Sequence, residues 1–124
     1  MKKVAVVIPC RNEERYIEKC VGSVLASDYP SENLRVIVCD GRSSDRTQEI
    51  VRTIAQNDSR VELLINRQET TPYALNLGIM HAADCDVFII LGAHSEINSD
   101  YVKLCIKNLQ NDSSVGCVGG ILEN

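Results

Sequence analysis

The chain has 124 residues, of which 44% are hydrophobic and 24% charged, and its formal net charge is −4. This length and composition are typical of one globular domain with its own core. The acidic balance and the lack of any basic run argue against nucleic-acid binding, and every apolar stretch is far shorter than the roughly 18 residues needed to span a bilayer.

Apolar segments of two kinds alternate along the chain. Near-continuous apolar runs predict four strands that are buried on both faces, over residues 3–9, 34–39, 61–65 and 86–91. Apolar residues at helical spacing follow each run, and the helix starts are expected at Asn12, at Ser44 or Asp45, at Pro72 and at Asp100. Residues 115–118 indicate a fifth strand. The alternation predicts an α/β fold, an open and mainly parallel sheet with helices on both faces.

The six cysteines lie mostly beside apolar residues and form no CxxC pair. They are Cys10, Cys20, Cys39, Cys85, Cys105 and Cys117. This spacing favours buried free thiols over a disulfide or metal framework. Free thiols imply a reducing compartment, so we expect a cytoplasmic protein.

An acid ends the second predicted strand. The β-branched run of residues 36–38 leads through Cys39 to Asp40, and a small-residue turn follows. Open parallel sheets bind ligands at the carboxyl ends of their strands, and an unpaired buried charge is costly. Asp40 is therefore the first candidate site residue, and a solvated turn acid is the alternative.

Polar residues also follow the first and fourth predicted strands, over residues 9–13 and 92–96. Three such strand ends at one edge of a sheet predict a ligand cleft, where the amino end of the first helix suits an anion such as a phosphate. The sequence has no GxxxxGKS loop and no GxGxxG motif, so neither a Walker-type NTPase nor a dinucleotide-binding domain is supported.

Several ordered motifs resemble family 2 glycosyltransferases with the GT-A fold. They read Val-Val-Ile-Pro-x-Arg-Asn-Glu, Val-x-Asp-Gly-x-Ser-x-Asp-x-Thr and Ala-Leu-Asn-x-Gly-Ile. The later pieces Leu-x-Ala-His-Ser, Asp-Tyr-Val and Val-Gly-Gly resemble the branch that contains succinoglycan-type glucosyltransferases. The resemblance covers essentially the whole chain. It implies that residues 1–124 are the nucleotide-sugar-binding part of a glycosyltransferase domain that is cut at its C-terminus.

The resemblance also implies roles for single residues. Pro9, Arg11 and Glu13 are expected to line the nucleotide pocket. Asp40 matches an acid that contacts uracil or another base, and a carboxylate can accept the ring N–H of such a base in a charge-assisted hydrogen bond. Arg67 follows the third predicted strand, where it can meet a diphosphate or can be an ordinary exposed cation.

Three residues of the resemblance are expected to be structural in the main. Asp45 is expected to cap the helix that follows it. Asn76 and Gly78 are expected to pack the third helix against the sheet near the cleft.

The end of the fourth predicted strand departs from the family. Family members usually have Asp-x-Asp there, whose last acid ligates a divalent metal, but this chain has Gly92, Ala93 and His94. Gly92 and Ala93 are expected beside the nucleotide sugar. His94 falls on the metal position, where neutral imidazole suits Mn²⁺ better than Mg²⁺. The alternative is a structural histidine at a strand end.

The resemblance implies a metal-dependent inverting transferase that moves a sugar from a nucleotide-diphospho-sugar to the hydroxyl of a glycan or lipid-linked acceptor, in polysaccharide or glycan biosynthesis. The catalytic base is expected beyond residue 124, so this segment alone is expected to bind donor without transferring sugar. The full-length protein is expected in the cytoplasm or at the cytoplasmic face of the membrane. The alternatives are a nucleotidyltransferase, whose glycine-rich loop is missing, and a non-catalytic nucleotide-binding or regulatory module, which Gly92 favours.

Overall fold

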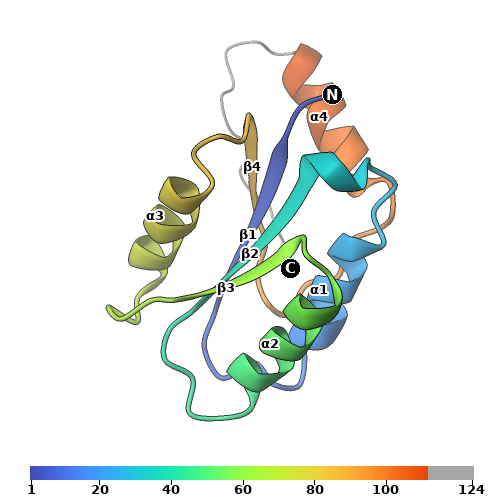
Figure 1. The fold of residues 1–124 in the computed structure, drawn as a ribbon. Helices are drawn as coiled ribbons and strands as arrows, with labels where there is room; N and C mark the ends of the chain where they lie inside the picture. Colours follow the sequence, from blue (N-terminus) through green and yellow to red (C-terminus); the bar gives the residue numbers. More distant parts are fainter. Residues whose placement is uncertain (112–124) are drawn as a thin grey trace.

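Four parallel strands and four α-helices alternate in the computed structural model, which describes residues 1–111 (Figure 1). The strands are β1 (Val4–Cys10), β2 (Leu34–Asp40), β3 (Val61–Ile65) and β4 (Val87–Ile90). The helices are α1 (Ile17–Leu25), α2 (Thr47–Asn57), α3 (Thr71–His81) and α4 (Tyr101–Asn111), with a short 3-10 helix at Ser31–Asn33. The predicted α/β fold is confirmed, whereas the predicted strand at 115–118 lies outside the described residues.

The strand order is β3-β2-β1-β4, and all neighbouring strands are parallel. Cys10 at the end of β1 pairs with Asp40 at the end of β2, and Asp40 pairs with Ile65 at the end of β3. The carboxyl ends of these strands therefore lie level with one another. This register brings the polar residues that follow each strand to the same edge of the sheet.

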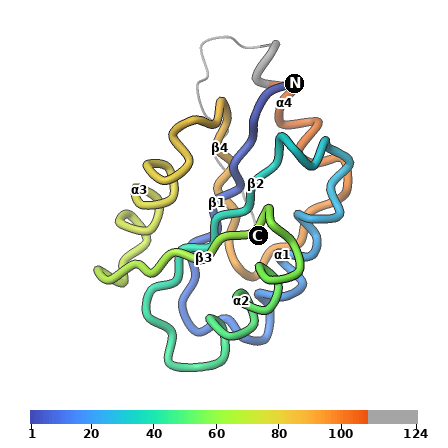
Figure 2. The backbone as a smooth tube through the Cα atoms, viewed as in Figure 1, coloured from blue at the N-terminus to red at the C-terminus, as the bar shows by residue number. Residues whose placement is uncertain are grey.

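Both faces of the sheet are covered, which explains why the strands are apolar at nearly every position. Val6 and Ile8 of β1 belong to the core beneath α1, α2 and α4, whereas Ala5 and Val7 belong to a smaller core beneath α3. Figures 1 and 2 show α3 alone on one side of the sheet and the other three helices on the opposite side. All four of these β1 side chains are fully buried.

The start of α1 corrects the prediction for Asn12. The helix begins at Ile17, after a turn in which the backbone N–H groups of Tyr16 and Ile17 both donate to the Glu13 carbonyl. Asn12 itself has a left-handed backbone with φ 54°. Its side chain accepts a hydrogen bond from the backbone of Ser44 in the next loop, so a contact between loops replaces the predicted helix cap.

The five cysteines within the described residues are free and buried, as predicted: Cys10, Cys20, Cys39, Cys85 and Cys105. Cys117 lies outside the described residues. Burial raises the pKa of the Cys20 thiol to about 12 and that of Cys39 to about 11. These thiols are therefore protonated at neutral pH and pack as small apolar groups. Within residues 1–111, none of the helices is long and apolar enough to cross a membrane.

Helix α3 lies close against the sheet at Gly78. A Cβ atom at this position would lie 2.6 Å from Val7 Cγ1 and 3.2 Å from Cys39 Sγ. The predicted packing role of Gly78 is thus confirmed, whereas Asn76, predicted to share it, is exposed.

We expect Gly78→Ala to destabilise the fold by about 1–3 kcal/mol, because the added methyl group overlaps side chains of a filled core. The matched control is Gly22→Ala in α1, where a Cβ atom would meet nothing within 4 Å. That variant is expected to gain up to about 1 kcal/mol from helix propensity. Urea unfolding measures both changes, and equal effects in the two variants would contradict the close approach of α3.

Candidate functional site

The carboxylate of Asp40 is fully buried at the end of β2 and is saturated with hydrogen bonds. Its Oδ2 accepts the backbone N–H of Ser43 at 2.7 Å and the side-chain amide of Gln48 at 2.7 Å. Its Oδ1 accepts the Ser43 hydroxyl, and that hydroxyl oxygen accepts the backbone N–H of Asn12 at 2.7 Å. The alternative that Asp40 is a solvated turn acid is therefore wrong.

A second carboxylate repeats this arrangement at the start of α2. Asp45 Oδ1 accepts the backbone N–H of Thr47 at 3.0 Å and the Thr47 hydroxyl. The Thr47 hydroxyl oxygen in turn accepts the backbone N–H of Glu13 at 2.9 Å. The N-cap residue is Arg46, so Asp45 supports the helix start from one residue before the N-cap and is not, as was predicted, the N-cap itself.

These two chains of hydrogen bonds run from a carboxylate through a hydroxyl to a backbone amide of the β1–α1 loop, and we call them the Asp40 relay and the Asp45 relay. They account for the spacing of the acids and hydroxyls in the motif after β2. A reciprocal bond, from the backbone N–H of Arg46 to the Glu14 carboxylate at 3.0 Å, adds to them. The β1–α1 and β2–α2 loops are thereby joined into one unit.

The hydrogen bonds that Asp45 accepts also lower its pKa. Burial by itself raises the pKa of this carboxyl, but the hydrogen bonds from Thr47 and from the backbone N–H of Glu14 outweigh it and hold the pKa below its usual value. Asp45 is therefore ionised at neutral pH and accepts three bonds as a carboxylate.

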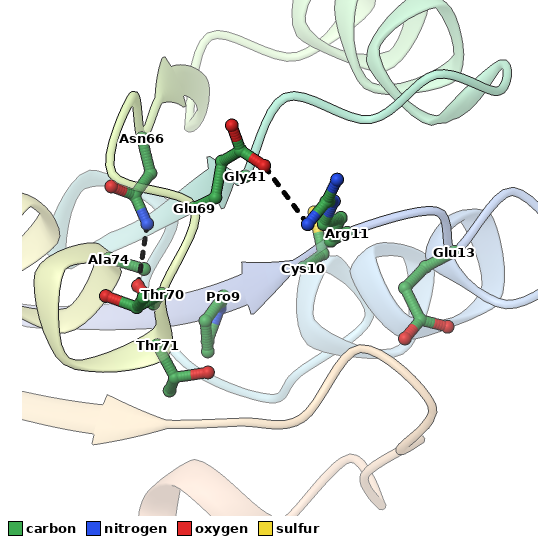
Figure 3. A pocket seen from close by; sticks show the side chains of 10 residues that line it. All are labelled: Pro9, Cys10, Arg11, Glu13, Gly41, Asn66, Glu69, Thr70, Thr71 and Ala74. Atoms are coloured by element: carbon green, nitrogen blue, oxygen red, sulfur yellow. Dashed lines mark hydrogen bonds and ion pairs between the residues drawn. The ribbon is translucent and has the colours of Figure 1, made fainter.

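An open cavity lies beside the joined loops, at the carboxyl ends of the strands. Its lining residues are Pro9, Cys10, Arg11, Glu13, Gly41, Asn66, Glu69, Thr70, Thr71 and Ala74 (Figure 3). The structure thus brings together the three residues Pro9, Arg11 and Glu13 that the sequence places in a cleft. Most of the wall comes from loops, and polar side chains dominate it.

Asp40 lies behind the wall of this cavity and not in its lining. Between them is Cys10, which lines the cavity and whose thiol donates to Asp40 Oδ1 at 3.5 Å. Gly41 is fixed next to it, because its backbone N–H donates to the Cys10 carbonyl at 2.8 Å. A direct bond from Asp40 to a ligand requires the Cys10 side chain to move aside and Ser43 or Gln48 to release a carboxylate oxygen.

His94 lies in the loop after β4, next to Glu13, which lines the cavity. Its Nε2 lies 3.2 Å from Glu13 Oε1, and its ring faces that of Tyr16 at a centroid distance of 4.9 Å. The side chain of His94 is 64% exposed and that of Glu13 only 16%. Burial raises the pKa of Glu13, and the nearby His94 works against that rise.

The part of the chain that the structure describes contains no group of three or more His, Cys, Asp or Glu side chains that could hold a metal ion. His94 and Glu13 offer two ligands. Gly92 and Ala93 do not line the cavity, and a Cβ atom at Gly92 would meet only Ser95 Oγ, at 3.7 Å. Packing alone therefore does not require glycine at this position.

The loop after β3 and the first residue of α3 supply cavity residues that the sequence patterns did not reveal. Asn66, Glu69, Thr70 and Thr71 all line the cavity. Asn66 is buried and its side-chain amide donates to the Thr70 carbonyl at 2.7 Å, which shapes the loop. A polar residue directly after a predicted strand was the available signal. Arg67, the residue predicted in this loop, is exposed and does not line the cavity.

Residues 5–124 match the family model described as Glycosyl transferase family 2. A dolichyl N-acetyl-alpha-D-glucosaminyl phosphate 3-beta-D-2,3-diacetamido-2,3-dideoxy-beta-D-glucuronosyltransferase of Methanococcus voltae is 34% identical over 128 residues, which cover 98% of this chain and 40% of the relative. The succinoglycan biosynthesis protein ExoA of Rhizobium meliloti (strain 1021) is 35% identical over 104 residues, which cover 83% of this chain and 31% of the relative.

A solved structure also matches the fold. The mannosyltransferase PcManGT from Pyrobaculum calidifontis, in complex with GDP-Man and Mn²⁺, has a TM-score of 0.81 and 28% sequence identity, over 87% of this chain and 32% of that chain. The chain therefore spans well under half the length of each protein it matches here. The matches confirm the predicted resemblance, including its succinoglycan branch, and the predicted fold.

We expect Asp45→Ala to lower the free energy of unfolding by about 1–2 kcal/mol at pH 7, as the loss of a capping side chain does. Because the pKa of Asp45 is lower in the folded state, its stabilisation is full above the ordinary value near 3.8 and is lost as the pH falls from there through the folded value. Urea unfolding at pH 7 and at about pH 3 measures this difference.

The control for that prediction is Asp28→Ala, which removes an exposed carboxylate paired with Lys103 at 2.8 Å. This variant is expected to change stability by less than about 0.5 kcal/mol. An Asp45→Ala effect as small as this, or one that grows as the pH falls, would refute the Asp45 relay.

Proposed function

The chain belongs to glycosyl transferase family 2, and from that premise we propose that residues 1–124 are the donor-binding part of an inverting glycosyltransferase. The donor is a nucleotide-diphospho-sugar, and the cavity beside the joined loops is its site. The single observation that carries this proposal is the meeting of Pro9, Arg11 and Glu13 in one cavity at the carboxyl edge of a parallel sheet. Open α/β sheets bind ligands at that edge.

The cavity has groups that suit the parts of a nucleotide. Pro9 offers an apolar surface to a base or sugar, and Arg11 offers a guanidinium to an anion. We retain Asp40 as the acceptor for the ring N–H of a base, reached when Ser43 or Gln48 releases an oxygen. Arg67 is proposed to approach the diphosphate from the loop after β3.

Two further parts of the proposal concern the end of β4 and the divalent ion. Gly92 and Ala93 are proposed to lie next to the donor sugar, and the ion is Mn²⁺ or Mg²⁺. His94 and Glu13 are the residues that would hold it, because their Nε2 and Oε1 atoms lie 3.2 Å apart, and imidazole and carboxylate are ligands that Mn²⁺ accepts. A bound ion would neutralise charge on the diphosphate leaving group. The mannosyltransferase of similar fold holds Mn²⁺.

The catalytic base and the residues that bind the acceptor are proposed to lie outside residues 1–124, because the matched relatives extend far beyond the aligned region. The acceptor is proposed to be a glycan or lipid-linked hydroxyl, which a carboxylate deprotonates for in-line displacement of the nucleoside diphosphate. The names of the two relatives, a dolichyl-linked sugar transferase and a succinoglycan biosynthesis protein, support a role in polysaccharide or glycan synthesis. The full-length protein is proposed to act in the cytoplasm or at the cytoplasmic face of the membrane. Within that scheme, residues 1–124 bind and orient the donor.

A non-catalytic nucleotide-binding module is the second candidate. Its support is Gly92, which supplies no acid where the family usually has one, together with the lack of a three-ligand metal cluster within residues 1–111. This module and the transferase share the nucleotide site and differ in the metal. Titrations of nucleotide and of metal therefore separate them.

We expect uridine or guanosine diphosphate to bind the protein, and Arg11→Ala to weaken that binding by about 1.5–3 kcal/mol, the range for a hydrogen bond to a charged group. The control is Lys103→Ala. Lys103 lies in α4, pairs with Asp28 and is outside the cavity lining, so this variant removes a positive charge away from the site. Isothermal titration calorimetry measures the affinities. Failure of both nucleotides to bind the unmodified protein would refute the proposed function.

We expect Mn²⁺ to bind more tightly when nucleoside diphosphate is present, and His94→Ala to remove most of that gain, because the variant loses one of two protein ligands. The matched control is His81→Ala, since His81 contacts Glu62 at 2.6 Å on the α3 side of the sheet, outside the cavity lining. Electron paramagnetic resonance of free Mn²⁺ gives the affinities without any activity assay. Equal Mn²⁺ affinities in the two variants would make His94 a structural residue.

A further inference from the structure

Two arginines converge on one carboxylate at the edge of the cavity. Arg11 Nη1 lies 3.1 Å from Glu69 Oε1, and Arg42 Nη1 lies 3.3 Å from Glu69 Oε2. Arg11 follows β1, Arg42 follows β2 and Glu69 follows β3, so all three come from strand-end loops. Figure 3 shows the bridge between Glu69 and Arg11 spanning from the β3–α3 loop to the end of β1.

The backbone at this place is strained. Arg42 has φ 62° and Glu69 has φ 65°, a left-handed conformation that side chains with a Cβ atom rarely adopt. With Asn12, they are the three non-glycine residues of positive φ in the described part of the chain, one after each of the first three strands. Strain of this kind gathers where loops form a ligand site.

The ion pairs of Glu69 are open to water. The side chains of Arg11 and Arg42 are 54% and 60% exposed, and that of Glu69 is 33% exposed. Exposed pairs of this kind contribute little stability, so another anion can replace the carboxylate readily. A diphosphate carries more charge than a carboxylate and accepts bidentate bonds from guanidinium groups.

We infer that Arg11 and Arg42 form the diphosphate-binding pair of the cleft and that Glu69 is an internal carboxylate that the diphosphate replaces. The inference rests on the proposed function for the nucleotide, and it adds Arg42, which does not line the cavity, to the binding residues. Glu69 holds both guanidinium groups at one place before the ligand arrives. It also competes with the ligand for them, so a phosphate-bearing ligand must displace it whereas a nucleoside need not.

The test uses Glu69→Gln, which keeps the size of the side chain and removes its charge. Affinities for uridine diphosphate and inorganic pyrophosphate are expected to rise about fivefold, the equivalent of one exposed ion pair, while the affinity for uridine stays the same. The direction of the change in affinity is diagnostic, because replacing a residue that only held the loop in place would lower the affinity for the ligand.

The chain offers a matched control in the pair Arg46–Glu49, which is also separated by 3.3 Å and exposed but lies on α2, outside the cavity lining. Glu49→Gln removes the same charge and is expected to leave all three affinities nearly unchanged. Arg42→Ala is expected to weaken uridine diphosphate and pyrophosphate binding severalfold without affecting uridine, and Arg46→Ala to have no such effect. Circular dichroism checks that each variant is folded.

The outcomes separate this inference from the proposed function. If Glu69→Gln matches Glu49→Gln, or lowers the affinity for pyrophosphate, the inference is overturned even where uridine diphosphate binds well. If the unmodified protein binds no nucleotide but Glu69→Gln binds pyrophosphate more tightly, the anion pair is supported and the proposed function is wrong. If neither ligand binds any variant, both are overturned.

Discussion

The buried carboxylate of Asp40 is the constraint on which the candidate site depends. A charge without exposed surface at the end of β2 is tolerated only when hydrogen bonds replace its lost hydration. Ser43 and Gln48 supply those bonds, which requires the chain to turn back directly after β2. The same turn presents the Ser43 hydroxyl oxygen to the backbone of Asn12. One buried charge therefore sets the shape of the β2–α2 loop and attaches the β1–α1 loop to it.

The Asp45 relay extends this order toward the end of β4. The Thr47 hydroxyl oxygen receives the backbone N–H of Glu13, which fixes the residue whose carboxylate both lines the cavity and faces His94. A path of hydrogen bonds and contacts thus leads from the start of α2 to His94 in the loop after β4. These contacts hold Glu13 and His94 in place, and preorganisation of this kind lowers the cost of ordering a site when ligand binds.

Residue patterns predicted the sheet well because burial on both faces leaves a strong local mark. The strand at 61–65 has its predicted bounds, and β1, β2 and β4 differ from theirs by one residue at each end at most. The predicted start of α1 was wrong. Asn12 has the residue type of a helix cap, but its side chain accepts a hydrogen bond from the backbone of Ser44, thirty-two residues away. The pairing of Arg42 with Glu69 is equally non-local, and no helical or strand periodicity in the sequence predicts it. Local signals thus predicted which residues end the strands, and tertiary contacts decided their partners.

The candidate site consequently has two halves of different physical character. Its β1 and β2 side is held by buried or charge-assisted hydrogen bonds, which resist exchange because breaking one leaves a buried group unsatisfied. On its β3 side, the backbone N–H of Asn66 donates to the Asp40 carbonyl at 2.7 Å, but the tip of the loop is joined to the other loops by the exposed ion pairs of Glu69, which water and salt weaken. At the β4 end, His94 and Glu13 are too few ligands to hold an ion by themselves. In the proposed function, an ion at this place takes most of its ligands from the diphosphate, and by linkage each then raises the affinity of the other. The diphosphate of the proposed donor would thus complete a site that has one rigid wall and two incomplete ends.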